Sequence, residues 1–253
     1  MSFFPFARRT YKEFLRDPVS MIFGAAFPVI LMIVLQIICK NLTNEGMEIA
    51  SVYQIDKMMI GISIYSFSFT SFYAGIRVSK DKNDYYIQRF YSANMELDDY
   101  ILGYVAPLLF ITFLQSIVCI TTAFLLDAIL SLDILHFGLN YLLLIGMMLP
   151  CEIIFICIGI MLGVSFKAKE SIYIFIGIII VTILTSNIFF NVSSFGSAYV
   201  IFCRALPFYP TYEALVGLLN GFTEAFPYYF VTIAYGIILF ILMIIIFKRK
   251  MNR

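Results

Sequence analysis

The sequence predicts an all-α integral membrane protein with six transmembrane helices. Of the 253 residues, 62% are hydrophobic and 13% are charged, whereas a soluble domain carries about 25% charged residues. Six apolar stretches are each long enough to cross the roughly 30 Å hydrocarbon layer as a helix. Lysine and arginine also gather in alternate connections between these stretches, as is typical of multi-pass membrane proteins. We expect one transmembrane domain over residues 1–253.

The chain begins with a pattern typical of an amphipathic helix, which we place at residues 1–19. At 100° per residue, one side collects aromatic and apolar residues and the other collects basic ones, represented by Phe4 and Phe14 against Arg8 and Lys12. This arrangement predicts an interfacial helix that lies flat on the membrane. An ordinary positively charged flank before the first span is the alternative, but it does not account for the aromatic stripe.

The six spans are expected at residues 20–39, 57–76, 101–126, 139–166, 171–190 and 226–247. The second and fifth spans carry hydroxyl and amide side chains on one face or toward one end. Polar side chains in a lipid environment tend to face other helices or a water-filled path. Helix contact and a substrate path therefore both remain open for these residues, which are Ser63, Ser66, Thr70 and Tyr73 in the second span and Thr182, Thr185, Ser186 and Asn187 in the fifth.

Glu152 is the one ionisable side chain deep inside an expected span, two residues after Pro150. A carboxylate at the bilayer centre costs roughly 2.5–3.5 kcal/mol on the lenient insertion scale. Glu152 should therefore be neutral, paired or exposed to water in a cavity. Glu152 could be a polar residue in a transport path, or it could pair with a residue of another subunit. Alternatively, it is a neutral acid that is hydrogen-bonded to a neighbouring serine or threonine.

The longest polar run lies between the second and third spans, at residues 77–100. It carries four basic and five acidic side chains, and also Tyr85, Tyr86, Phe90 and Tyr91 at helical spacing. A loop that faces only water has no use for such aromatic residues, whereas a short helix that docks against another protein does. We expect a docking helix at residues 80–91.

Residues 191–225 are too polar for a span and too apolar for a free loop. Pro210 and Thr211 are typical of a helix start, with Thr211 as the N-cap and Gly221 as the C-terminal stop. We expect one or two re-entrant helices that enter the outer leaflet without crossing it. Such segments persist only where they pack against protein or border water.

The orientation follows from the positions of lysine and arginine. With six spans and the N-terminus inside, only Lys40, Lys57 and Arg204 of the 17 basic residues lie outside. This asymmetry predicts that both termini and the docking helix are cytoplasmic. We expect a multi-pass membrane protein.

The sequence contains no catalytic motif. It has no GxxxxGK[ST] phosphate loop, no HExxH, and no paired carboxylates or nucleophile and base at one membrane depth. The five cysteines show no metal-ligand spacing and are expected to be buried thiols. We expect no catalytic residue, metal or cofactor in this chain, and any ATP would be bound by another protein.

Four segments together resemble the permease subunit of type-2 ABC exporters, over essentially the whole chain. The first is the basic arm that leads into a span with Phe27 and Pro28. The second is the polar segment KDKNDYYIQRFYSANM, and the third is DYILGYVAPLL at the start of the third span. The fourth is the proline-rich LPFYPTYEALVGLLNG before the last span.

The resemblance implies a homodimer of permeases with two copies of an ABC ATPase subunit, which would bind ATP and Mg. The docking helix would be the cytoplasmic coupling helix that sits in a groove on the ATPase. In the family this segment often reads Glu-Arg-x-x-Gly, whereas Asp81 and Lys82 stand here at the acidic-basic pair and Asp84 or Tyr85 replaces the glycine. The implied coupling residues are Asp81, Lys82, Asn83, Asp84, Tyr85, Tyr86, Arg89 and Phe90.

The resemblance also implies that the second and fifth spans line the path between subunits and that residues 191–225 close the exit. The candidate path residues are Ser63, Ser66, Thr70, Tyr73, Glu152, Thr182, Thr185, Ser186 and Asn187. The path is mostly uncharged, aromatic and hydroxyl-bearing, which favours a drug, peptide antibiotic or amphipathic peptide over a strongly anionic polymer.

The expected function is ATP-driven export of a hydrophobic or amphipathic compound from the cytoplasm or the inner leaflet. The partners are the ATPase, a second permease and membrane lipids, with no nucleic acid. One alternative is an exporter of a lipid-linked glycan. The other is an ion- or proton-coupled carrier or channel that acts without an ATPase, although such carriers usually place several ionisable groups in their spans.

Overall fold

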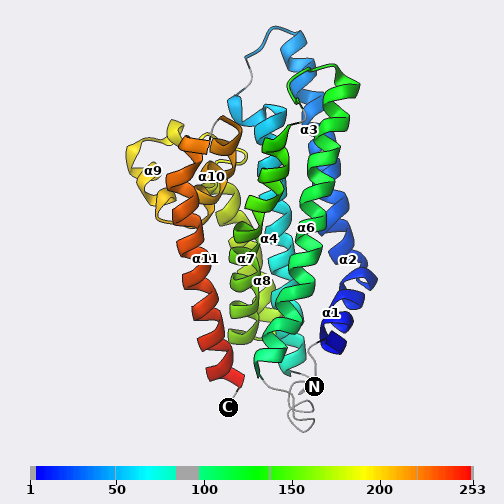
Figure 1. The fold of residues 1–253 in the computed structure, drawn as a ribbon, viewed down its shortest axis with the longest axis vertical. Helices are drawn as coiled ribbons and strands as arrows, with labels where there is room; N and C mark the ends of the chain where they lie inside the picture. Colours follow the sequence, from blue (N-terminus) through cyan, green and yellow to red (C-terminus); the bar gives the residue numbers. More distant parts are fainter. Residues whose placement is uncertain (1–3, 49, 84–96, 137, 221, 252–253) are drawn as a thin grey trace.

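The structure is a computed structural model that describes residues 4–48, 50–83, 97–136, 138–220 and 222–251. Over these residues the chain is helical and contains no strand, and its helices form an elongated bundle (Figure 1). The elements are α1 (Phe4–Arg16), α2 (Pro18–Met21), the π-helical turn η1 (Ile22–Ala26), α3 (Phe27–Asn44), η2 (Ser51–Tyr53), α4 (Ile55–Asn83), α6 (Leu97–Leu130), α7 (Leu139–Ser165), α8 (Ala168–Thr185), η3 (Val192–Phe195), α9 (Ser197–Arg204), α10 (Phe208–Asn220) and α11 (Phe222–Met251).

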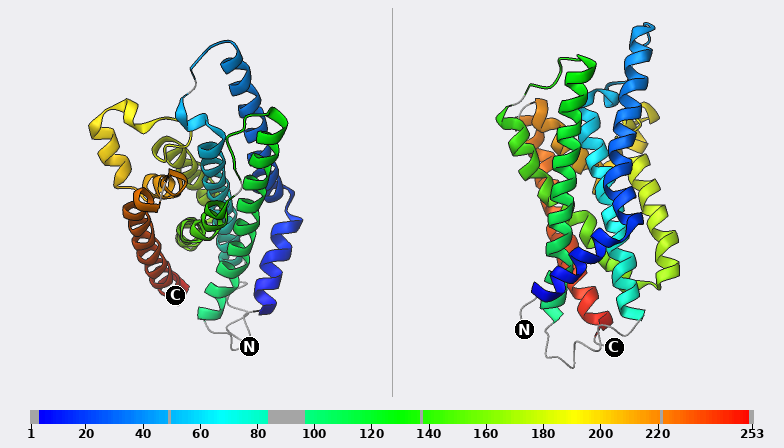
Figure 2. Two further views of the ribbon diagram at one scale, coloured as in Figure 1. Left: turned by 45° about the horizontal axis from the view of Figure 1, so that its top comes forward. Right: turned by 90° about the vertical axis from the view of Figure 1, so that its right-hand side faces the viewer.

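In the described part of the chain, six helices are long and apolar enough to cross a membrane, which confirms the predicted fold class. Figure 2 shows that α1 begins and α11 ends at the same end of the bundle. The six candidate spans are Pro18–Asn44, Ile55–Asn83, Asp98–Leu130, Leu139–Ser165, Ala168–Thr185 and Ala225–Lys250.

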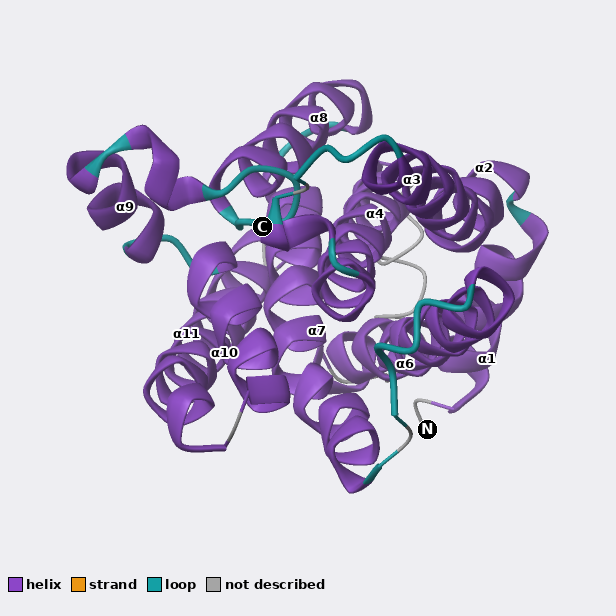
Figure 3. Cartoon of the chain, turned by 90° about the horizontal axis from the view of Figure 1, so that it is seen from above, coloured by secondary structure: helices purple, strands orange, loops and turns teal. Residues whose placement is uncertain are grey.

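Helix α4 is the centre of the bundle, with α3, α6, α7 and α8 around it (Figure 3). Within the most apolar 18-residue stretch of α4, 83% of the residues are buried, although the mean hydropathy of this stretch is the lowest among the six candidate spans. The hydroxyl side chains that lower its hydropathy are therefore placed inside protein, where they find partners, and not against lipid. The outward faces of α3, α8 and α11 instead carry exposed large apolar side chains, as a lipid-facing surface requires.

Helices α4 and α7 touch backbone to backbone through small residues. A Cβ built on Gly159 would lie 2.4 Å from the carbonyl oxygen of Ser71, and Gly75 and Gly163 meet in the same way one turn further along. Gly159 and Gly163 are four residues apart, as are Ser71 and Gly75, which is the small-xxx-small pattern of close helix pairs in membranes.

Helix α1 packs its aromatic face against protein as well as exposing part of it. The ring centroids of Phe6 and Tyr104 are 4.9 Å apart, and those of Phe14 and Tyr73 are 4.8 Å apart. Both pairs pack edge to face. Gly103 makes room for Phe6, because a Cβ there would lie 2.2 Å from the Phe6 ring. Phe4 stays exposed. The aromatic stripe of α1 that the sequence predicts therefore packs largely against α4 and α6.

Residues 191–220 form η3, α9 and α10, and α9 lies to one side of the bundle (Figure 1). Helix α10 contacts α4, α7, α8 and α11, and it buries Tyr212 and Leu215. It begins at Phe208, so Thr211 lies within the first turn, where its hydroxyl donates to the carbonyl oxygen of Pro207 at 2.6 Å. The expectation that Thr211 is the N-cap was wrong. Gly221 lies outside the described residues.

Candidate functional site

A charged network ties α1 to the C-terminal end of α4 and the N-terminal part of α6. The Asp81 carboxylate accepts from Arg9 Nη2 at 3.0 Å and from the Tyr104 hydroxyl at 2.7 Å, and it lies 3.1 Å from Arg77 Nη2. Glu13 Oε1 completes the network, at 2.9 Å from Arg9 Nε and 2.7 Å from Arg77 Nη2. The Asp81 side chain is only 5% exposed. The two carboxylates and two guanidinium groups balance in charge within the chain.

The last turn of α4 is also bound to the end of α7. Lys82 Nζ donates to the carbonyl oxygen of Val164 at 2.6 Å, and the Ser79 hydroxyl donates to that of Phe166 at 2.9 Å. These bonds satisfy carbonyl groups that have no partner inside α7, since a helix leaves its last four carbonyls unpaired. The structure thus places Asp81 and Lys82 in contacts within the chain, and Asn83 is exposed. Asp84, Tyr85, Tyr86, Arg89 and Phe90 lie outside the described residues.

The predicted hydroxyl face of α4 lies against neighbouring helices. Ser66 donates to the carbonyl oxygen of Gly24 at 2.6 Å, and Thr70 donates to Gln115 Oε1 at 2.9 Å. Ser63 donates within α4, to the carbonyl oxygen of Met59. These three hydroxyls are buried and serve helix packing. Gln115 was not expected as a partner, because a hydropathy pattern does not show which helix faces which.

Glu152 is fully buried between α7 and α6. Its two carboxyl oxygens accept hydrogen bonds from Thr112 at 2.9 Å and from Ser116 at 3.4 Å. Within the described ranges no basic side chain forms a salt bridge with it. Of the alternatives left open by the sequence, this geometry corresponds to the acid bound by a neighbouring threonine and serine.

The fifth span ends at Thr185, earlier than the expected 171–190, because Asn187 adopts a left-handed conformation with φ of 62°. Its side chain then bridges two elements. Asn187 Nδ2 donates to Glu213 Oε1 at 2.9 Å, and its Oδ1 accepts from the backbone N–H of Val192 at 2.9 Å. Ser186 and Thr185 donate within the helix, to Thr182 and Val181, and the Thr182 hydroxyl is buried without a described partner.

Glu213 is a functional candidate that we did not single out from the sequence. It is the only charged residue between positions 205 and 222, in an otherwise apolar and uncharged segment. Burial raises the pKa of its carboxyl group, and the hydrogen bonds from Asn187 and Tyr209, with the charges of Arg204 and Lys57, partly offset that rise. Burial raises the pKa of Tyr209 as well, to about 12.

An open groove of about 850 Å³ lies among the described residues. We call it the lateral groove. Its walls are the α1–η1 segment, α4 and α8. Of the predicted path residues only Tyr73 lines it; neither Glu152 nor the other hydroxyl residues do. The groove is assembled from three segments far apart in the sequence, so no local pattern indicated it.

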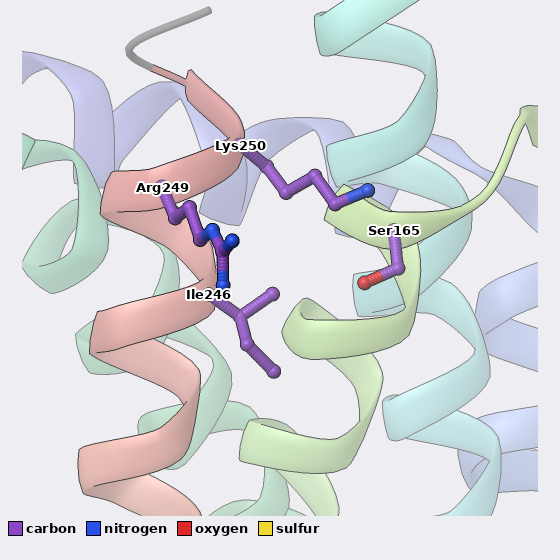
Figure 4. A pocket seen from close by; sticks show the side chains of 4 residues that line it. All are labelled: Ser165, Ile246, Arg249 and Lys250. Carbon is purple, nitrogen blue, oxygen red and sulfur yellow. The ribbon is translucent and has the colours of Figure 1, made fainter.

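A smaller pocket of about 340 Å³ lies between the C-terminal ends of α7 and α11. Figure 4 shows that Lys250 and Arg249 extend from α11 and that Ser165 stands across from them on α7. Ile246 forms the apolar side of the pocket. The Ser165 hydroxyl donates to the carbonyl oxygen of Met161 at 2.8 Å. The two charged side chains that line the pocket, Arg249 and Lys250, are both basic.

Comparison with known families decides the identity of the chain. Residues 2–220 match the model of the ABC-2 type transporter family. The chain belongs to the ABC-2 type transporter family. No curated protein matches the sequence. The family match extends from α1 to the end of α10 and so includes the charged network, Glu152, Glu213 and the lateral groove.

As an ABC-2 membrane domain, the chain is a multi-pass transport subunit without an ATPase domain of its own. ATP binding in such systems belongs to a partner ATPase, with which ABC-2 permeases generally pair. The family match agrees with a helical bundle that has six candidate membrane spans. It leaves the substrate, the oligomer and the orientation to be argued from this chain.

Proposed function

We propose that two copies of this chain, with two ABC ATPase subunits, form an exporter of the bacterial cytoplasmic membrane with both termini in the cytoplasm. It moves a hydrophobic or amphipathic compound, such as a drug, a peptide antibiotic or an amphipathic peptide, out of the cytoplasm or the inner leaflet. The observation that carries the proposal is the lateral groove, a large, mainly apolar space that opens at the side of the bundle.

The central helix connects this groove to the proposed ATPase contact. Helix α4 is unbroken from Ile55 to Asn83, and it supplies Phe69, Phe72 and Tyr73 to the groove wall. The proposed coupling helix, residues 80–91, begins on its last turn. Because one helix carries both, a movement imposed at the coupling helix would displace the groove wall as well.

In this arrangement the two ends of the coupling helix have different roles. Asp81 and Lys82 hold its base, through Arg9 and Tyr104 on one side and Val164 on the other. The aromatic residues Tyr85, Tyr86 and Phe90, with Asn83, Asp84 and Arg89, are the proposed contact surface for the ATPase. Aromatic anchors commonly dominate the energy of such contacts.

The contacts of Glu152 favour an ATP-driven exporter over a proton-coupled carrier. A carrier needs ionisable groups that reach the path, but both oxygens of Glu152 bind hydroxyls of α6, and the side chain does not line the groove. Helices α9 and α10, with the Asn187–Glu213 bond, are proposed to close the outer exit above the groove.

Purification of the tagged chain from its own membranes tests the proposal. We expect a protein with a GxxxxGK[ST] phosphate loop to co-purify in equal amount, and ATP hydrolysis by that complex to drive export in proteoliposomes. Transport by the chain alone, in response to an ion or proton gradient and without ATP, would instead show the carrier. The same assay with and without ATP separates the two outcomes.

A further inference from the structure

The charges that line the lateral groove are unequal in sign. Glu13 and Arg77 belong to the charged network, where Arg9 and Asp81 balance them. The remaining ionisable groups of the lining are Arg16, Lys80, Lys169 and Asp17. Three of these four groups are basic, so the lining of the groove carries a net positive charge at neutral pH.

The three basic groups have no counter-ion in the described part of the chain. Arg16, Lys80 and Lys169 are exposed, and none forms an ion pair with another described residue. Asp17, by contrast, already accepts a hydrogen bond from Ser20. The positive charges come from three elements. Lys80 lies near the end of α4, Lys169 near the start of α8 and Arg16 at the end of α1, and all three line the groove.

The rest of the lining is aromatic and aliphatic. Phe23 and Ile176 are 42% and 48% exposed in the groove, and Phe69, Phe72 and Ile172 join them. Along α8 the wall runs from Lys169 to Ile179, which is about 15 Å of helix. A lining that combines basic groups with an apolar wall of this length matches an acidic head joined to an alkyl chain.

We propose that the lateral groove binds an acidic amphiphile and that this is the class of compound the transporter exports. The acidic head, a phosphate, sulfate or carboxylate, lies among Arg16, Lys80 and Lys169, and the apolar chain lies on the phenylalanine and isoleucine wall. The inference rests on the proposed export function and narrows its substrate from any amphipathic compound to an anionic one.

Charge complementarity also decides against the other occupants of the groove. A cationic amphiphile would find Asp17 as its only carboxylate that the charged network does not already neutralise. A zwitterionic lipid brings no net charge to the positively charged lining.

Calorimetric titration of the purified full chain in phosphatidylcholine nanodiscs tests this inference, with empty discs as the blank. The probes share one alkyl chain and differ in the head: dodecyl phosphate, dodecyltrimethylammonium and dodecyl maltoside. We expect dodecyl phosphate to bind about a hundredfold more tightly than the other two, because three basic groups attract its charged head.

Two double variants locate the binding. Lys80→Gln with Lys169→Gln removes two positive charges from the groove and should weaken dodecyl phosphate binding about thirtyfold. Arg8→Gln with Lys12→Gln removes the same charge from exposed positions on α1 outside the groove, and it should leave binding within about twofold. Equal losses in both pairs would show a general surface effect and overturn the inference.

Other results would overturn it in identifiable ways. Equal affinity for the three probes would show that the groove reads only apolar surface. Loss of dodecyl phosphate binding on adding phosphatidylglycerol to the discs would make the occupant a resident membrane lipid. A disulfide between two copies of Ile176→Cys in a Cys39→Ser background would show that a second copy covers the groove. None of these measurements involves the ATPase, so they can fail while the exporter function stands.

Discussion

Gly163 on α7 lies against the backbone of Gly75 on α4, and a Cβ at Gly163 would come within 2.3 Å of the Gly75 carbonyl oxygen. The obstacle is backbone and cannot rotate away as a side chain would. The crossing therefore admits only glycine at this position without moving one of the two helices. Because α4 also carries the groove wall and leads to residues 80–91, the spacing of α4 and α7 sets where both of those lie.

Gly163→Ala is expected to destabilise the bundle by about 1–3 kcal/mol, the usual range for overpacking a tight core. Gly146→Ala is the matched control, because Gly146 lies in the same helix and a Cβ there meets nothing within 4 Å. Thermal unfolding of both variants in detergent measures the difference. A Gly163→Ala protein as stable as Gly146→Ala would contradict the close contact.

The charged network predicts energetic coupling between Arg9 and Asp81. Asp81→Asn removes the charge that offsets two guanidinium groups in a largely buried site, and breaking a buried pair from one side costs more than removing both partners. A double-mutant cycle of Arg9→Gln and Asp81→Asn should give a coupling energy of about 1–3 kcal/mol. The control is Glu45→Gln, at an exposed position outside the network, which should shift stability by less than about 0.5 kcal/mol.

The spans could be predicted from the sequence because the thickness of the membrane fixes how much apolar chain is needed. Their ends could not. Ile188 and Phe189 extend the apolar run of the fifth span, but Asn187 leaves the helical conformation before them. Asparagine adopts the left-handed conformation more readily than most residues, yet it does so here because its side chain finds Glu213 and Val192.

The candidate site was predicted less completely than the spans. A polar helix face, such as the one that carries Ser66 and Thr70, indicates that this face does not contact lipid. The sequence does not say whether the face contacts another helix or water. The structure supplies Gly24 and Gln115 as the partners. The lateral groove could not be predicted from the sequence, because Arg16, Lys80 and Lys169 line one space only when α1, α4 and α8 are packed.

Glu152→Gln is expected to leave folding and export nearly unchanged. The glutamine keeps an oxygen that can accept from the Thr112 hydroxyl, and it introduces no charge. Glu152→Lys should greatly reduce the amount of folded protein, because it places a cation of different length in a fully buried site. Yield and thermal stability of the two variants measure this. Loss of export in the glutamine variant alone would show that a charged Glu152 is required.

Replacing Tyr85, Tyr86 and Phe90 together by alanine is expected to weaken association with the ATPase by about 2 kcal/mol or more, as truncation of aromatic anchors usually does. Membrane insertion should be unaffected, because the spans are unchanged. Co-purification of the ATPase measures the loss, and the amount of protein in the membrane fraction is the control. Undiminished co-purification and transport would place the contact elsewhere.

The last prediction concerns pH and the Glu213–Asn187 bond. Burial disfavours the charged carboxylate, so Glu213 holds its proton more tightly in the folded protein than in the unfolded chain, where its pKa is about 4.5. Below that pH both states are protonated and the contribution of Glu213 to stability is complete. As the pH rises above it, the unfolded chain ionises first, and the free energy of unfolding falls until the folded group ionises as well.

Glu213→Gln should therefore lose less stability than the wild type as the pH rises from about 4.5 to the raised pKa of the folded carboxyl group. The glutamine retains an oxygen for Asn187 Nδ2, so the hydrogen bond at 2.9 Å can persist. Unfolding midpoints across this range, taken as variant minus wild type, isolate the effect from other titrating groups. The exposed Glu45→Gln serves as the control. A difference that falls with rising pH would mean that the charged form of Glu213 is the one the fold stabilises.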